Sequence, residues 1–359
     1  MRRYFSSLHP YKEHLTTIIF VVGIVIDMLI LPDIEDPKAR YFGMAYLTVI
    51  GSLILFREWI VSRNRVTQME ERIYGISTFG IVCFSGSALS FVCIYAWRSA
   101  ALSVSWPLFL IFILCILANE LVSTHSFRFT LDVGVFFIAM LFYIVFNVPI
   151  LVKQQNDSVF GLAVVCSIAI SLLYTYILKH MSDSARFEAS RIYALAFGIP
   201  MFVGMLYFLN VLPAVPLSLA SGGVYHNIIR TESGDFIGQA ETDTRPFSSL
   251  RTDVYHLTPE DSGVYFFSAV DAPAKLSAPL SHVWEYYDEK TKKWIPTTTI
   301  SFTLEGGREN GYRAYSKKEN IVNGLWRVTV NVDGNRVIGR VTFEVVRSNQ
   351  PVTIVETKI

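Results

Sequence analysis

Long apolar stretches in the first 212 residues constrain this chain more than any other feature. A helix needs about 20 apolar residues, at about 1.5 Å of rise each, to cross the ~30 Å hydrocarbon core of a bilayer. Seven stretches come close to that length: 15–31, 41–56, 75–97, 107–122, 129–152, 159–178 and 192–212. The sequence therefore predicts an all-α, multi-pass membrane bundle of about seven spans over residues 1–212, surrounded by the lipid bilayer.

The chain from Pro213 onward has the composition of a water-soluble domain. Across the whole chain 52% of residues are hydrophobic and 17% are charged, yet residues 213–359 hold 16 Lys and Arg against 17 Asp and Glu. This balanced charge provides no basic field, which argues against a nucleic-acid partner.

Short β-branched and aromatic runs separated by Gly, Asp and Pro follow Pro216, a pattern typical of strands. The expected strands cover 223–229, 263–270, 282–287, 297–304, 311–316, 325–332 and 337–346. Asp333-Gly334 between the last two predicts a tight hairpin. We expect an all-β, antiparallel, sandwich-like domain over 223–359, joined to the bundle by a linker at 213–222.

Lys and Arg residues between the spans predict the orientation of the bundle, because cytoplasmic loops carry an excess of them. With the N-terminus inside, eleven fall on the inner side: Arg2, Arg3, Lys12, Arg57, Arg63, Arg65, Arg72, Arg128, Lys179, Arg186 and Arg191. Four fall outside: Lys38, Arg40, Arg98 and Lys153. An odd number of spans then places the β domain outside, which for a bacterial inner-membrane protein is the periplasm.

Ionisable side chains within a span are costly and are therefore candidates for function. Asp27 lies inside the first predicted span. It is a candidate ligand for a proton or cation. Alternatively, it reaches the outer interface or a structural partner such as Asn147 or Asn210.

A second polar group lies at the predicted inner ends of two spans, in the sequence NELVSTHSFRFTLD. It comprises Glu120, His125, Arg128 and Asp132. Such a set can relay protons or hold an anion. The alternative is that these residues cap helix ends and pair their charges at the level of the lipid head groups.

The loop LEGGRENGYRAYSKK is the best candidate ligand site of the β domain. Its glycines allow tight turns that present backbone N–H groups. Donors suited to phosphate or carboxylate come from Arg308, Arg313 and Lys317, and rings that can stack on a sugar come from Tyr312 and Tyr315. The alternative is a solvated hairpin loop.

His282, Trp284 and Tyr286 share one face of a predicted strand. If exposed, this face would bind a glycan or peptide. If buried, it is part of the core, which is the more usual place for a Trp in an alternating strand.

Catalytic and metal motifs are absent from the sequence, including HExxH, Walker and GxGxxG patterns. None of the four cysteines (Cys83, Cys93, Cys115 and Cys166) belongs to a CxxC pair. We therefore expect no metal or cofactor, and the sequence favours a non-enzyme.

Longer motifs of the tail resemble a known family. AVDAPAKLSAPLSHVWEYYDEKTKKW, SFTLEGGRENGYRAYSKKENIVNGLWRVTV and DGNRVIGRVTFEVV are similar to domain-of-unknown-function family 2914. The hydrophobic part resembles family 5924, the uncharacterised membrane region that accompanies it in bacterial proteins. The resemblance implies a bacterial inner-membrane protein and brings no activity and no catalytic residue.

Two functions remain open from the sequence. In the first, the bundle anchors a periplasmic β domain that binds or scaffolds an envelope component, which is a protein, a glycan or a lipid head group. In the second, the bundle itself transports or modifies a lipid or small solute through Asp27 or the Glu120–Asp132 group, and the β domain acts as a lid.

Overall fold

The structure is a computed structural model that describes residues 21–22, 25–27, 37–62, 68–98, 110–118, 125–154, 156–209, 211–212, 217–232, 235–241, 252–259, 261–271, 277–305, 312–332, 334, 336–348 and 352–359. The chain forms two compact units. The first is helical and lies mainly within the first 212 residues, and the second is built from strands and lies mainly beyond them.

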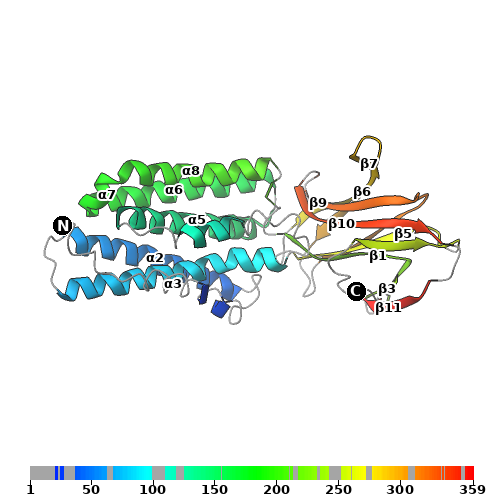
Figure 1. The fold of residues 1–359 in the computed structure, drawn as a ribbon, viewed down its shortest axis with the longest axis horizontal. Helices are drawn as coiled ribbons and strands as arrows, with labels where there is room; N and C mark the ends of the chain where they lie inside the picture. The colour runs from blue at the N-terminus through cyan, green and yellow to red at the C-terminus, as the bar shows by residue number, and fades with distance from the viewer. Residues whose placement is uncertain are drawn as a thin grey trace. The chain divides into compact units, whose positions relative to one another are not determined.

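Long helices lie side by side in the helical unit (Figure 1). The labelled helices are α2 (Pro37–Ser62), α3 (Gln68–Arg98), α5 (His125–Val152), α6 (Asp157–Met181), the short α7 (Asp183–Phe187) and α8 (Ala189–Phe208). Among the described residues, five segments are long and apolar enough to cross a membrane: Arg40–Ser62, Arg72–Ser90, Phe127–Val152, Asp157–Met181 and Ala189–Phe208. Large apolar side chains such as Leu173, Phe197 and Met201 face outward, as expected where lipid rather than water surrounds a helix. The N-terminal half is thus that of a membrane protein.

Five of the seven predicted spans coincide with these helices. The other two, predicted at 15–31 and 107–122, lie on segments described only in part, which are helical at 21–22, 25–27 and 110–118. The total of seven spans therefore stays a prediction.

Small residues allow α6 and α8 to pack closely. At intervals of four residues they lie on one helix face, where they let two backbones approach each other. The buried residues with this spacing are Ala163, Ser167 and Ser171 on α6 and Ala196, Pro200 and Gly204 on α8. The ring of Phe160 on α6 stacks on that of Tyr207 on α8, with 3.5 Å between centroids.

The described residues of the β unit form three sheets. Its strands are β1 (Ser218–Tyr225), β2 (Asn227–Arg230), β3 (Phe236–Glu241), β4 (Asp253–Leu257), β5 (Val264–Asp271), β6 (Ser277–Asp288), β7 (Lys293–Glu305), β8 (Tyr312–Lys318), β9 (Gly324–Val332), β10 (Arg336–Arg347) and β11 (Ile354–Lys358). The strand orders are β1-β5-β8, β4-β10-β9-β6-β7 and β11-β3-β2.

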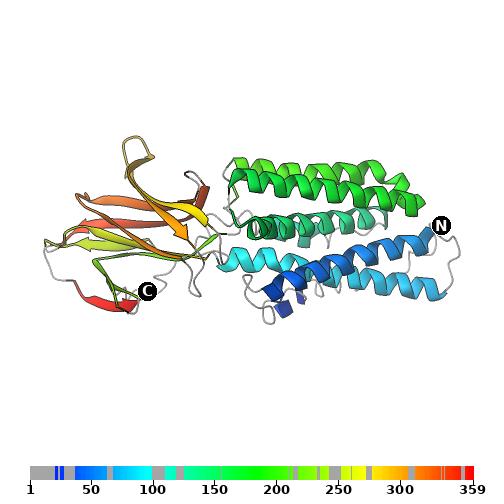
Figure 2. The same ribbon diagram turned by 180° about the vertical axis from the view of Figure 1, so that it is seen from behind.

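The sheet β1-β5-β8 is the middle layer of three (Figures 1 and 2). On β5, Val264 and Phe266 point into the main core, which the five-stranded sheet shares through residues such as Trp284. Phe267 and Ala269 point the other way, into a smaller core beneath the sheet β11-β3-β2. Successive side chains alternate between the faces of a strand, so β5 is apolar on both faces because both are covered.

Each predicted strand overlaps an observed one, and the β domain is confirmed as a set of sheets. The strand predicted at 223–229 is interrupted at His226 and belongs to two strands, β1 and β2. β1 begins at Ser218, inside the predicted linker. Three strands were not predicted, and one of them, β4, pairs with β10 in parallel, so the expectation of a purely antiparallel domain is wrong. β4 and β11 have only five residues each, too few for a clear alternating pattern.

Candidate functional site

Three of the predicted ligand residues lie on one face of β8. Arg313, Tyr315 and Lys317 occupy alternate positions, which places their side chains on the same side of the sheet. Tyr312 packs instead against the main core. Arg308, the fifth residue predicted for this loop, lies outside the described residues.

Neighbouring strands add rings and a cation to this side of β8. The Tyr315 ring lies 6.3 Å from Tyr265 on β5 and 5.9 Å from Phe236 on β3, measured between centroids. Arg230 on β2 lies over the Phe236 ring at 5.8 Å, and Lys317 Nζ lies 5.6 Å from the Tyr265 ring. We call the set Arg230, Phe236, Tyr265, Arg313, Tyr315 and Lys317 the aromatic-basic face.

Ion pairs partly neutralise the cations of the aromatic-basic face. Asp235 pairs with Arg313 at 3.6 Å and with Lys358 at 2.7 Å. Glu319 accepts a hydrogen bond from Lys317 at 2.9 Å, which raises the pKa of that lysine and keeps it charged. In the part of the chain that the structure describes, Arg313 and Lys358 share Asp235, and Lys317 pairs with Glu319.

Tyr315 is the most accessible ring of this face, at 41% exposed. An exposed tyrosine beside guanidinium and ammonium groups can stack on a sugar ring while the cations bind a phosphate or carboxylate. The arrangement suits a ligand that combines a ring with an anionic group.

His282 and Trp284 lie in the interior of the β unit, at 1% and 0% exposed, so they do not form an exposed binding face. His282 hydrogen-bonds through Nε2 to Ser268 Oγ at 2.8 Å and through Nδ1 to Ser316 Oγ at 2.9 Å. Burial lowers the pKa of His282 to about 3, so the ring is neutral. Tyr286, on the same strand, packs against the main core.

A histidine between two carboxylates is a feature that sequence analysis missed. His226 Nδ1 lies 2.8 Å from Asp261 Oδ1, and its Nε2 lies 3.1 Å from Glu241 Oε1. Burial alone would lower the pKa of His226, but the hydrogen bonds to Glu241 and Asp261 outweigh burial and raise it. The Tyr255 ring stacks on the imidazole at 4.4 Å. This arrangement favours the imidazolium form.

Glu241 connects this histidine to a second one. Its carboxylate accepts hydrogen bonds from the backbone N–H of His256 at 2.5 Å and from the His256 ring at 2.6 Å. Burial raises the pKa of Glu241, but the hydrogen bonds from His226 and His256 outweigh burial and lower it. The His226 network consists of His226, Glu241, His256 and Asp261. Its members are far apart in the sequence, so no spacing motif could have revealed it. The described part of the chain contains no group of three or more His, Cys, Asp or Glu arranged for a metal ion.

Asp27 is buried at 4% exposure and hydrogen-bonded within the helical unit. It accepts from the Tyr46 hydroxyl at 3.0 Å and from Ser90 Oγ at 3.1 Å. The partners considered from the sequence are not the ones observed: the Asn147 amide donates to the Tyr143 carbonyl, and Asn210 lies outside the described residues.

Asp132 and Arg128, two members of the predicted polar group, meet a residue from another helix. Arg57 on α2 donates from Nη1 to Asp132 Oδ2 at 2.5 Å, and Arg128 Nε lies 3.2 Å from Asp132 Oδ1. Glu58 lies beside Arg57 and accepts from Ser182 Oγ at 3.3 Å. Arg57 and Glu58 are both 0% exposed, whereas sequence analysis counted Arg57 among the loop charges.

We call Arg57, Glu58, Arg128 and Asp132 the Arg57 network; its formal charges cancel. Of the two remaining residues of the predicted group, Glu120 lies outside the described residues, and His125 begins α5 with a side chain that is not described. The helical spacing from Ile50 to Ile54 to Arg57, all of which are buried, is the signal that could have indicated that Arg57 points inward.

The second half of the β unit matches a known protein family. Residues 277–345 match a family model described as a protein of unknown function, DUF2914. This range covers most of the stretch from β6 to β10, including three members of the aromatic-basic face, and confirms the resemblance for the C-terminal part. No curated protein matches the chain. The resemblance of residues 1–212 to family 5924 stays a prediction.

Proposed function

We propose that this chain is a multi-pass protein of the bacterial inner membrane whose β domain lies in the periplasm and binds an envelope component that carries an anionic group beside a ring. The observation that carries the proposal is the exposed Tyr315 ring flanked by Arg313 and Lys317 on β8. Glycans and lipid head groups of the cell envelope offer this combination of ring and anion.

The loop charges support the orientation. Arg57 and Arg128 form the buried ion pairs with Asp132, so they are removed from the count of loop charges. Nine inner residues against four outer ones remain, which keeps the bias toward a cytoplasmic N-terminus. Attaching a cysteine-reactive, membrane-impermeant label to Lys290→Cys in intact and permeabilised cells tests the side: labelling that requires permeabilisation of the inner membrane contradicts the proposal.

Binding is tested with the full-length protein in lipid nanodiscs. Soluble peptidoglycan fragments and lipopolysaccharide core oligosaccharides are titrated against it, with an uncharged oligosaccharide of similar size as the reference. We expect the charged ligands to bind more tightly, and the substitution of Arg313→Ala together with Tyr315→Ala to weaken them at least about tenfold, which corresponds to about 1.4 kcal/mol.

The matched control changes the same residue types elsewhere, with Arg347→Ala at the exposed end of β10 and Tyr287→Ala at the end of β6. If the control weakens binding as much as the β8 pair does, the aromatic-basic face is not the site.

The alternative function places the activity in the helical unit, with the β domain as a lid. Its support is that the Arg57 network is buried in helices long enough to span a membrane and that Asp27 is buried against two of them through Tyr46 and Ser90. Asp27→Asn preserves shape and removes the charge. If Asp27→Asn abolishes a cellular phenotype that Arg313→Ala leaves intact, the alternative is favoured.

A further inference from the structure

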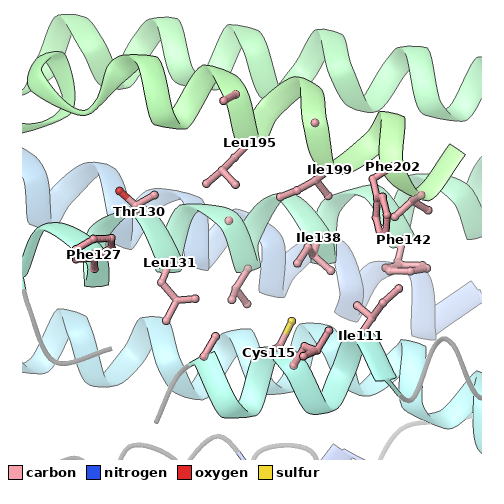
Figure 3. Close-up of a pocket in the computed structure, with 17 residues that line it drawn as sticks. Ile111, Cys115, Phe127, Thr130, Leu131, Ile138, Phe142, Leu195, Ile199 and Phe202 are labelled. Atoms are coloured by element: carbon pink, nitrogen blue, oxygen red, sulfur yellow. The ribbon is translucent and has the colours of Figure 1, made fainter. Parts of the chain in front are cut away.

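An elongated cavity of about 580 Å³ lies between α5, α8 and the helical segment 110–118. Figure 3 shows side chains from all three elements converging on it, among them Ile138 from α5, Ile199 from α8 and Ile111 from the third. Its volume falls within the range of about 300–1,000 Å³ that is usual for small-molecule sites. Nearly all of its lining is apolar, so its occupant must be apolar as well.

The cavity follows α5 for a long distance. Phe127 and Phe142 both line it, and fifteen residues of helix correspond to about 22 Å. Gly134 on α5 and Gly198 on α8 widen it because they contribute no side chain. A long apolar space between helices, partly open at Leu114, Phe127 and Phe202, matches the shape of a single acyl chain.

One end of the cavity is polar. Thr130, one turn beyond Phe127, lines the wall, and its Oγ1 is buried with no hydrogen-bond partner among the described residues. An unpaired buried hydroxyl costs free energy unless a ligand supplies the partner. It is therefore suited to an ester oxygen, which in a phospholipid lies between the acyl chain and the phosphate.

A cation lies at the same end. The Arg191 guanidinium is 5.5 Å from the centre of the Phe127 ring, and its side chain is 55% exposed. One of its nitrogens, Nη1, donates to Glu188 at 2.8 Å, and the guanidinium has five N–H donors in all. α8 begins at Ala189, just before Arg191, and α5 begins at His125, just before Phe127, so the positive ends of two helix dipoles lie close to this point.

We propose that this cavity binds one acyl chain of an anionic phospholipid, with the phosphate at Arg191 and an ester oxygen at Thr130. The order of groups in the lipid, phosphate then ester then hydrocarbon, is the order of the complementary groups along α5 and α8. This inference concerns the helical unit only and does not depend on the function proposed for the β domain.

The test is native mass spectrometry of the full-length protein released from detergent, after addition of phosphatidylglycerol or phosphatidylethanolamine with identical acyl chains. We expect one lipid to remain bound, and phosphatidylglycerol to be retained more than phosphatidylethanolamine. Gly198→Leu places a side chain in open space within the cavity, because no atom lies within 4 Å of the added Cβ. It is expected to reduce retention of both lipids at least about tenfold.

Gly161→Leu on α6 is the matched control, since its added Cβ also meets no atom within 4 Å and Gly161 does not line the cavity. Both changes replace glycine by a better helix former, so neither is expected to unfold its helix. Arg191→Gln is expected to abolish the preference for phosphatidylglycerol while one chain stays bound. Arg186→Gln, which breaks a comparable ion pair with Asp183 on α7, should keep the preference.

Three results would overturn the proposal. Equal lipid retention by Gly198→Leu, Gly161→Leu and the unmodified protein would show that lipid binds elsewhere. Equal retention of the two lipids by the unmodified protein would remove the role of Arg191. A dimer that dissociates on Gly198→Leu substitution would show that a second copy of the chain fills the cavity.

Discussion

The helical and β units each bury a network of charged side chains, but only the network of the β unit contains histidines. The Arg57 network joins α2 to α5 through an arginine, whose charge is permanent. The His226 network joins the break between β1 and β2 to β3 and β4 through two histidines, whose charge depends on pH. The helical unit thus pairs its buried carboxylates with arginine, whereas the β unit pairs its own with histidines, whose charge changes near neutral pH.

The surroundings explain this difference. A charged side chain in a membrane span must be paired because neither water nor lipid can solvate it, and the formal charges of the Arg57 network cancel. In the β unit, Glu241 and His256 are partly exposed, at 16% and 40% of their side chains, so water can take part as the network titrates.

The largest loss of folding stability is expected from Arg57→Met. It leaves the buried carboxylates of Asp132 and Glu58 without Arg57, and breaking a buried pair on one side costs about 3–5 kcal/mol. We expect a corresponding fall in the free energy of unfolding of the full-length protein, measured in detergent by circular dichroism.

The double variant Arg57→Met with Asp132→Leu should lose less than the sum of the two single variants, because it removes a pair rather than leaving one charge alone. Additive losses would show that the two side chains are not coupled.

The next largest loss of folding stability is expected from His226→Gln, and the size of this loss depends on pH. The raised pKa of His226 stabilises the fold fully below its ordinary value of 6.5, and this contribution is lost as the pH rises through the raised pKa. The lowered pKa of Glu241 acts in the opposite direction: its contribution is present above 4.5 and is lost as the pH falls through the lowered pKa. The β unit should therefore be most stable between about pH 4.5 and 6.5.

Calorimetry of the full-length protein across this range measures the effect. His226→Gln is expected to reduce the stability of the β unit by about 1–3 kcal/mol near pH 6 and to flatten the decline above it. His282→Gln is the comparison, because His282 is already neutral. If the stability of the His226→Gln variant falls above pH 6 as steeply as that of the unmodified protein, another group causes the pH dependence.

The smallest loss of folding stability is expected from Arg327→Lys. Arg327 belongs to a partly exposed group that also contains Glu285 and Trp294. Arg327 on β9 donates two hydrogen bonds, both at 2.7 Å, to Glu285 on β6 and lies 4.3 Å from the Trp294 ring. Lysine keeps the charge and loses the two-point contact. We expect a loss of up to about 1 kcal/mol, because such pairs near the surface contribute little. Arg347→Lys on β10 should change stability less; equal losses would mean that the two-point contact contributes nothing measurable.

The sequence predicted the division into a helical and a β part and the approximate position of most strands, because both follow from hydrophobic length and alternation. It also grouped Arg313, Tyr315 and Lys317 as parts of one loop; they lie together because they occupy alternate positions of strand β8. Treating the segment as a loop placed Tyr312 with these residues, whereas its position on β8 puts it on the opposite face. The sequence did not predict β4 and β11, whose pairing depends on strands far away in the chain.

The sequence by itself determined that the first half is apolar enough for a membrane and the second is not, since the free energy of burying apolar surface is a sum over residues. Only the tertiary structure decided which polar groups meet. Arg57 and Asp132 are 75 residues apart and His226 and Asp261 are 35 apart, yet each pair is in contact. Such contacts depend on helix packing and strand order, and no local spacing in the chain encodes them.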